Sequence, residues 1–267
     1  MNWQFIRAIA EKDLAEVAKN RIAVMGAVVL SLVFAVGVPL LITQIAVMTT
    51  ESDLSEFDTI SAIVPAAQLA GLTPEQLPIV LILGYLIAPL FLVLPLMLSC
   101  TIAAEAFVGE KERKTLEALL YTPATDAELF IGKALAALIP GIVFTWANFV
   151  IFAIVTNIAG YPAMGRIWFP TESWLALMII VVPAVALLGV SATVIISTKV
   201  STFMEAYQAS GALVILIIIL GVAQSTGLLF LSPSVAVVVG LALFILDAIL
   251  IRIGIQLFSR SGLIARI

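Results

Sequence analysis

The densest group of ionisable side chains in the chain lies between residues 109 and 123, GEKERKTLEALLYTP. Glutamates and basic residues are interleaved from 110 to 114, and Leu116, Leu119 and Leu120 follow at helical spacing. An ordinary loop with helix-pairing contacts would explain the charges. It would not explain the leucines, because an exposed apolar face flanked by charge is typical of a helix that docks into a partner's groove. We therefore expect a docking helix here.

A second candidate is Asp247, the only acidic residue well inside a long apolar segment. A carboxylate in a membrane is costly enough to mark a functional site by default. It could bind a proton or a cation during transport. It could equally make a structural hydrogen bond to a polar residue of another segment, such as Asn148, Gln208 or Gln224. Both interpretations stay open at this point.

Several kinds of chemistry are disfavoured. The chain has no histidine and one cysteine, Cys100, so we expect neither a metal site nor a disulfide. The basic residues are few and scattered, which argues against a nucleic-acid partner. Gly132-Lys133 lacks the upstream glycine and the following serine or threonine of a phosphate-binding loop. We therefore expect no enzyme in this chain, and we expect Lys133 to extend toward the lipid headgroups.

The elements that position these residues are predicted to be membrane helices. The 267 residues are 63% hydrophobic and 11% charged, with a mean hydropathy of +1.21, whereas soluble domains have about 25% charged residues. Each apolar segment is long enough to cross a bilayer as a helix. The fold class is therefore all-α, a single membrane domain over 1–267 with six transmembrane helices. The segments are 22–48, 78–104, 129–159, 173–197, 207–228 and 233–258.

Local signals refine the ends and shapes of these helices. Thr125 with Glu128 forms a capping-box pattern, and Ser232-Pro233 is typical of a helix start. Prolines inside the apolar segments predict kinks. They are Pro39, Pro89, Pro95, Pro140 and Pro183.

The basic residues predict the orientation. With six spans, all of them but Arg166 fall on one side, so that side should be cytoplasmic and hold both termini and the loop 105–128. We expect the protein in the inner or plasma membrane. Residues 2–20 have Trp3, Ile6, Ala10, Leu14 and Val17 on one face, which predicts an amphipathic helix along the inner interface. A solvated helix without a membrane role is the alternative.

The stretch from Glu110 to Leu120, followed by Pro123 and Gly132-Lys133, resembles the permeases of type-2 ABC exporters, the ABC-2 superfamily. Lys12-Asp13-Leu14 and Asn20-Arg21 are similar to that family's opening. The resemblance is sharpest over 105–133, and it departs from the family at Lys114, where many relatives have glycine.

The resemblance implies that 105–128 contains a cytoplasmic coupling helix, which sits in a cleft of a separate ABC ATPase subunit, and that 1–21 is a connecting helix. It implies a second permease copy, which forms a homodimer with the first in the bilayer, and ATP and Mg bound by the ATPase, with no cofactor in this chain. The residues it assigns to contacting or positioning the ATPase are Glu110, Lys111, Glu112, Arg113, Thr115, Leu116, Glu117 and Leu120.

We therefore expect the permease subunit of an ATP-driven exporter. The cargo stays open among lipid, drug, peptide and sodium. The competing hypotheses are an ion-coupled secondary transporter or channel that uses Asp247, and a membrane scaffold that transports nothing.

Overall fold

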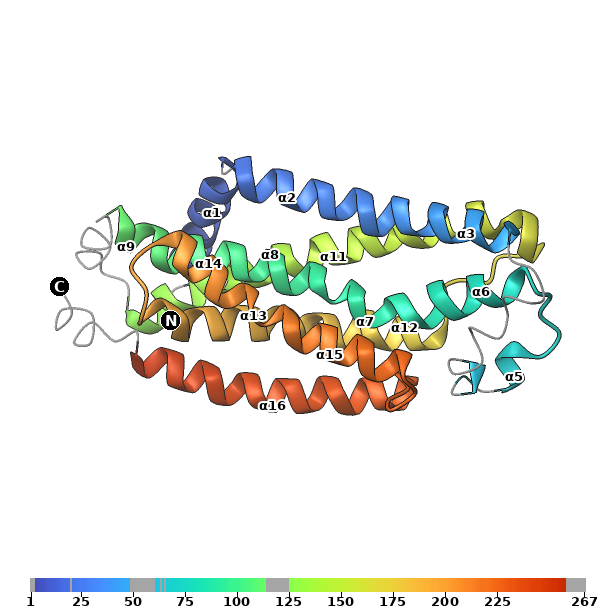
Figure 1. Cartoon of the computed structure of the whole chain (residues 1–267). Helices are drawn as coiled ribbons and strands as arrows, with labels where there is room; N and C mark the ends of the chain where they lie inside the picture. Colours follow the sequence, from blue (N-terminus) through green and yellow to red (C-terminus); the bar gives the residue numbers. More distant parts are fainter. Residues whose placement is uncertain are drawn as a thin grey trace.

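The chain folds into a bundle of long helices that run side by side, with one shorter helix lying across one end (Figure 1). The computed structural model describes residues 3–19, 21–48, 61–62, 64, 66–113 and 125–257. Within those ranges the regular elements are all helical. Six of the helical stretches are long and apolar enough to cross a membrane, which confirms the predicted fold class. They are Met25–Ala46, Gln76–Glu112, Ala127–Met164, Glu172–Ser197, Phe203–Ser225 and Pro233–Gln256.

Most of these spans are built from several helical pieces, where η denotes a π-helical turn. The crossing helix is α1 (Trp3–Lys19). The first span comprises α2 (Arg21–Ser31), η1 (Leu32–Gly37) and α3 (Val38–Met48), and the short helix α5 (Ala66–Leu69) follows. The second comprises α6 (Gln76–Leu81), η3 (Ile82–Leu86), α7 (Ile87–Phe91), α8 (Val93–Ala104), η4 (Glu105–Gly109) and α9 (Glu110–Glu112). The remaining elements are α11 (Asp126–Met164), α12 (Glu172–Ala176), η5 (Leu177–Val181), α13 (Val182–Ser197), α14 (Phe203–Gly211), α15 (Val214–Ser225) and α16 (Pro233–Leu257).

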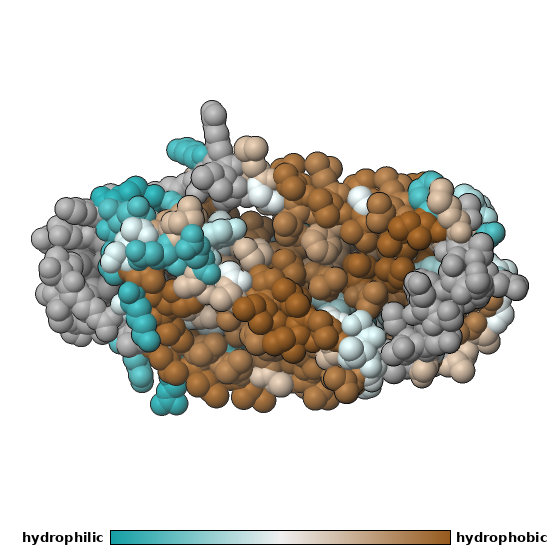
Figure 2. Space-filling model, viewed as in Figure 1, coloured by the Kyte–Doolittle hydropathy of each residue, from teal (hydrophilic) through white to brown (hydrophobic). Residues whose placement is uncertain are grey.

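The surface carries a broad apolar belt between two more polar ends (Figure 2). Large apolar side chains such as Leu41, Ile154, Ile219 and Ile245 are exposed along the sides of the bundle. Such a surface would be unfavourable in water and is suited to lipid. Together with the six apolar helices it makes this a multi-pass membrane protein.

The second and fourth spans form the centre of the bundle, since most of their residues are buried while the other spans are largely exposed. Toward the end of the molecule that holds α6 and α12, an aromatic cluster fills the core between them. The Trp174 ring stacks on Phe152 at 5.1 Å between centroids and meets the edges of Phe91 and Phe169 at 5.3 and 5.2 Å. These contacts pack the two central spans tightly against α11.

The predicted helix starts are confirmed. The Thr125 hydroxyl accepts from Glu128 N at 3.3 Å, and the Glu128 carboxylate accepts from Thr125 N at 2.9 Å, so α11 begins with a complete capping box. Pro233 opens α16, where Ser232 Oγ accepts from Val235 N at 3.3 Å.

The prolines have a more specific effect than the expected simple kinks. Pro39, Pro89 and Pro183 each lie within three residues after a π-helical turn, respectively η1, η3 and η5. Proline removes one backbone donor and clashes with the preceding turn, and a wider turn relieves that clash. The carbonyls released in η3 are used by side chains, because Trp174 Nε1 donates to Gly84 O at 3.0 Å.

Several boundaries differ from the sequence prediction, and two of them differ by five residues or more. The second span does not end at residue 104, because η4 and α9 continue it to Glu112. The first part of the predicted loop 105–128 is therefore helix. The third span likewise extends past residue 159 to Met164. The extension of the second span carries the ionisable residues Glu105, Glu110, Lys111 and Glu112, and that of the third contains Gly160 and Pro162, which disfavour a helix, so the sequence placed both ends too early.

Helix α1 packs on the protein with part of the face that we expected to rest on lipid. Ile6 and Val17 are buried, whereas Trp3 is exposed. Gly132 of α11 lets the backbone of α1 come close, because a Cβ at that position would lie 3.2 Å from the carbonyl oxygen of Ile6. The helix is thus attached to α11, and the structure holds it at the same end of the bundle as α9 (Figure 1).

Candidate functional site

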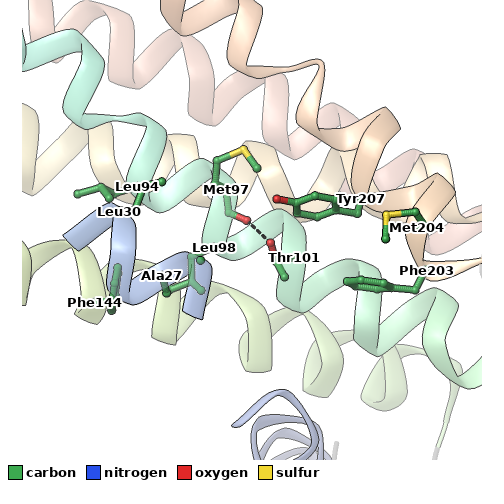
Figure 3. A pocket seen from close by; sticks show the side chains of 11 residues that line it. Ala27, Leu30, Leu94, Met97, Leu98, Thr101, Phe144, Phe203, Met204 and Tyr207 are labelled. Atoms are coloured by element: carbon green, nitrogen blue, oxygen red, sulfur yellow. Dashed lines mark hydrogen bonds between the residues drawn. The ribbon is translucent and has the colours of Figure 1, made fainter. Parts of the chain in front are cut away.

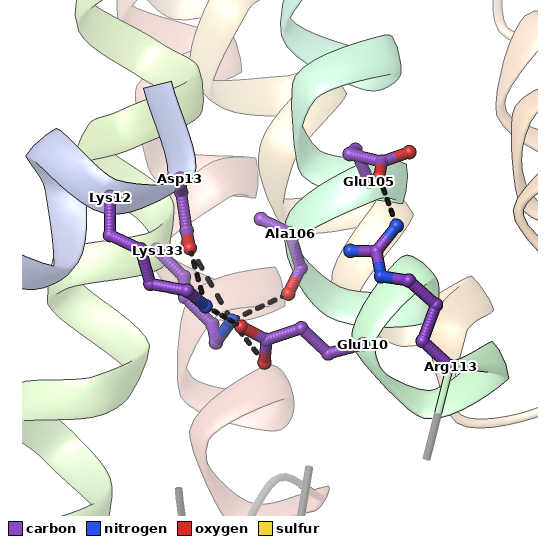
Figure 4. Close-up of polar contacts among 7 residues, drawn as sticks. All are labelled: Lys12, Asp13, Glu105, Ala106, Glu110, Arg113 and Lys133. Carbon is purple, nitrogen blue, oxygen red and sulfur yellow. Dashed lines mark hydrogen bonds and ion pairs between the residues drawn. The ribbon is translucent and has the colours of Figure 1, made fainter. Parts of the chain in front are cut away.

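A buried cluster of charges joins α1, α9 and α11 at the end of the bundle that holds α9 (Figure 4). Lys133 of α11 lies at its centre, and its Nζ is 2.7 Å from Glu110 Oε2 and 3.5 Å from Asp13 Oδ2. Lys12 pairs with the other oxygen of Glu110, and its Nζ is 3.5 Å from Asp13 Oδ1. Four charges from three elements therefore neutralise one another. We call these residues, Lys12, Asp13, Glu110 and Lys133, the charge cluster.

The members of the charge cluster are removed from water to an unusual degree. Glu110 and Lys133 are each 1% exposed and Asp13 is 2% exposed. The Lys133 ammonium also donates to the Ala106 carbonyl oxygen at 2.6 Å, so a residue of η4 helps to compensate its desolvation. Buried ions are tolerated only when they are paired and hydrogen-bonded. The cluster is therefore a rigid connection between its three helices.

Asp13 is the least well satisfied member. Neither of its carboxylate oxygens accepts a hydrogen bond, although both lysines lie at 3.5 Å. Burial raises the pKa of the Asp13 carboxyl above its usual range, and the positive charge of Lys133 offsets only part of that effect. The α1 end of the cluster is thus its weaker end.

Other residues of α9 contact a different part of the molecule. Lys111 Nζ donates to the Val200 carbonyl oxygen at 2.8 Å, and Glu112 Oε2 accepts from the backbone N–H of Phe203 at 2.7 Å. Val200 lies in the connection between α13 and α14, and Phe203 is the first residue of α14. Arg113 pairs instead with Glu105 of η4, at 2.6 Å. The three residues of α9 therefore reach two separate neighbours, the charge cluster and the start of α14.

The structure describes half of the residues that were predicted to couple to an ATPase. It brings Glu110, Lys111, Glu112 and Arg113 together on and beside α9. The other four lie outside the described residues; they are Thr115, Leu116, Glu117 and Leu120.

Sequence reasoning was wrong about Lys133 and gave Asp13 no role. Lys133 does not extend toward headgroups; it is buried and bonded to Glu110. The reason is that a basic residue about two turns into an apolar helix has two ways to find partners, water at the helix end or an acid on a neighbouring helix. The signal that was available is two basic and two acidic residues, Lys12, Asp13, Glu110 and Lys133, all predicted on the same side of the membrane.

Asp247 of α16 lies in a separate place, fully buried against α13. Its Oδ1 is 3.4 Å from the Ser191 hydroxyl, and its Oδ2 has no hydrogen-bond partner. The amides of the suggested partners Asn148 and Gln224 donate to carbonyl oxygens of Phe144 and Tyr85, and the residue that meets Asp247 is Ser191. Within the described ranges, no group of three acidic, cysteine or histidine residues is arranged to hold a metal.

A cavity of about 120 Å³ lies between α2, α8 and α14, with Phe144 of α11 at its edge (Figure 3). Its lining has no charged side chain, and the polar groups at its wall are the hydroxyls of Tyr207 and Thr101. Thr101 already donates to Met97 O at 2.7 Å. The remaining lining is apolar and comprises Gly26, Ala27, Leu30, Leu94, Met97, Leu98, Phe203 and Met204.

Six apolar helices, with a buried charge cluster at one end and an uncharged cavity between the helices, define a polytopic α-helical membrane protein. The family model for the ABC-2 family transporter protein matches residues 7–246. The chain therefore belongs to that family, and it is the membrane component of an ABC exporter, which implies an ABC ATPase subunit as its partner. Neither the curated proteins nor the solved structures contained a match.

Proposed function

We propose that this permease receives the force of ATP-driven ATPase movement at residues 110–120 and uses it to export a lipophilic cargo. The observation that carries the proposal is the charge cluster, in which Glu110 of α9 is joined to α1 and α11. A segment that only closed a loop would need no buried ions. A segment that must carry force to two other helices needs connections that do not slip, and buried ion pairs supply them.

The proposed assembly has two permease copies and two ATPase subunits, with the α9 end and both termini on the cytoplasmic side. The charges support this orientation, because Lys12, Lys111 and Lys199 lie at the α9 end while Arg166 follows α11 at the other. ATP and Mg would be held by the ATPase. Residues Leu116 and Glu117, which lie outside the described ranges, would enter its cleft, as their sequence pattern suggests.

The cavity supports lipid or lipophilic drugs more than sodium as cargo. Desolvating a sodium ion requires several oxygen ligands, whereas the cavity lining has two hydroxyls and no carboxylate. An apolar molecule would lose little on leaving lipid for such a cavity. Met97 and Met204 add flexible, polarisable surface that adapts to different shapes.

The test of coupling is co-expression of the permease with candidate ABC ATPase subunits, followed by co-purification and measurement of ATP hydrolysis. Leu116→Asp combined with Glu117→Lys should release the ATPase, whereas Arg166→Gln at the opposite end should not. If the double variant retained both the ATPase and cargo export into vesicles, the coupling role of this segment would be wrong.

A second candidate function is ion-coupled transport through Asp247, and its unpartnered Oδ2 is the observation that favours it. The test is uptake into vesicles that hold the permease without any ATPase. Transport driven by a proton or sodium gradient, and lost in Asp247→Asn, would support the alternative. ATP-dependent export that persists in Asp247→Asn would instead assign this carboxyl a structural role.

A further inference from the structure

Helix α14 forms one wall of the cavity and is attached to α9 at its first residue. The first two turns of α14 contribute Phe203, Met204 and Tyr207 to the lining. The same Phe203 donates its backbone N–H to Glu112 Oε2 at 2.7 Å. Phe203 therefore makes the contact that fixes the start of α14 and also lines the surface that a cargo would meet.

The attachment consists of several contacts. Lys111 Nζ donates to the Val200 carbonyl oxygen, so α9 binds the chain both three residues before α14 and at its first residue, Phe203. Beneath these polar contacts, Ala206 of α14 packs with Ala104 and Val108 in a small apolar cluster. The charged acceptor also lies at the positive end of the helix dipole, where a carboxylate is favoured. We call the contacts of Lys111 and Glu112 with Val200 and Phe203 the α9–α14 clamp.

The opposite wall of the cavity is tied to the same segment by another route. That wall is α2, which contributes Gly26, Ala27 and Leu30 and follows α1 in the chain. Helix α1 is held to α9 by the Lys12–Glu110 pair of the charge cluster. Both walls are thus fastened to α9, a helix of three residues.

The floor of the cavity packs against both walls but is separated from α9 along the chain by a π-helical turn. It is formed by Leu94, Met97, Leu98 and Thr101 of α8, and the π-helical turn η4 separates α8 from α9. A π-helical turn has a poorer hydrogen-bond pattern than an α-helix and is a common position for bending at functional sites. A displacement of α9 can therefore move the walls relative to the floor.

We propose that the α9–α14 clamp transmits displacement of residues 110–120 to α14 and so sets the width of the cavity, with Glu112 as its principal positioning residue. The inference rests on the proposed function, because the displacement is taken to come from an ATPase. It assigns to Lys111 and Glu112 a role inside the permease, in place of the ATPase contact expected for them from family resemblance.

The first test uses the permease alone in lipid nanodiscs. Hydrogen exchange of the peptide 199–207 should be roughly tenfold faster or more in Glu112→Ala, since a charge-assisted hydrogen bond is lost. Glu112→Gln retains an amide oxygen as acceptor and should restore most of the protection. The matched control is Glu205→Ala, whose carboxylate accepts from Ser201 N within the same connection and does not belong to the clamp. Equal exchange in Glu112→Ala and wild type would overturn the clamp.

The second test measures the width of the cavity in the assembled transporter. Spin labels at Val28→Cys on α2 and Gln208→Cys on α14, both exposed positions outside the lining, report the distance between the walls in a Cys100→Ala background. In wild type this distance should shift between the nucleotide-free and ATP-trapped states. The shift should be lost in Glu112→Ala and kept in Glu112→Gln and Glu205→Ala, with equal amounts of bound ATPase.

The outcomes separate the inference from the proposed function. A shift that persists in Glu112→Ala would overturn the inference while leaving the coupling to an ATPase intact. A wild-type permease that binds no ATPase would sink the proposed function. In that case the spin-label measurement on the permease alone still tests whether the clamp exists, because the distribution of distances between the labels should broaden in Glu112→Ala and not in Glu205→Ala.

Discussion

Lys133→Met tests whether the charge cluster is a strong structural connection. The substitution keeps an unbranched apolar side chain but removes the cation at the centre of the cluster, which lies 2.7 Å from Glu110 and 3.5 Å from Asp13. Two buried carboxylates would then share one lysine, Lys12, whose side chain is 45% exposed. Removing one partner of a buried ion pair costs about 3–5 kcal/mol. For a chain of this size that corresponds to a fall in Tm of about 6–20 °C.

The assay is thermal unfolding of the purified permease in one fixed detergent, with tryptophan fluorescence as the readout. Two controls give the result its meaning. Lys133→Met with Glu110→Gln removes both members of the central pair, restores neutrality, and should recover much of the loss, because an intact buried pair contributes little net stability. Arg113→Met breaks the pair with Glu105 at the same end, but the Arg113 side chain is 47% exposed. Its partner Glu105 is only 11% exposed, so the loss of Arg113 should cost more than that of a surface pair but less than that of Lys133, which is 1% exposed like its partner Glu110.

The reasoning would be refuted by two results. A Tm change in Lys133→Met no larger than that in Arg113→Met would mean that the cluster is accessible to water in the membrane-bound protein. Additive losses in Lys133→Met and Glu110→Gln would mean that the two residues do not interact, whatever their 2.7 Å separation.

Three further substitutions have defined outcomes. Asp13 has a raised pKa in the folded protein, so its ionisation lowers stability as the pH rises from the ordinary aspartate pKa through the folded value. Asp13→Asn should therefore exceed wild type in Tm at about pH 7, with the difference shrinking below about pH 4. Asn157→Leu should cost about 2–4 kcal/mol in thermal unfolding, because Asn157 bonds the backbone of Trp168 and Phe169. Trp174→Phe retains a single aromatic ring but loses part of a fully buried indole and the donor to η3, and should cost about 2–4 kcal/mol in the same assay.

The sequence predicted the parts of the fold that depend on local patterns. Hydropathy located six spans because each apolar run must satisfy its own backbone in lipid. The ends at Thr125 and Pro233 were predictable because a cap depends on residues three or fewer positions apart. The family resemblance of residues 110–120 was correct about the class of protein, as the match over 7–246 shows.

The parts that escaped prediction depend on pairs that are distant in the chain. Glu110 is separated from Lys12 by 98 positions and from Lys133 by 23, so nothing in the spacing connects them. The same holds for Glu112 and Phe203, which are 91 positions apart. The partner of Asp247 was missed for a further reason. A short serine such as Ser191 is a common residue in membrane helices, and the sequence alone does not distinguish it from many others.

The π-helical turn η4 also has a consequence for rotation about the helix axis. Such a turn accommodates one residue more than an α-helical turn of the same span. If Glu105–Gly109 rewound as an α-helix without any change of sequence, α9 would rotate about 100° relative to α8 and advance about 1.5 Å. Deleting one residue from η4 would instead leave the faces of α8 and α9 in their present relation. The angular relation between the cavity floor and Glu110 is thus set by the winding of a single turn, in steps of one residue.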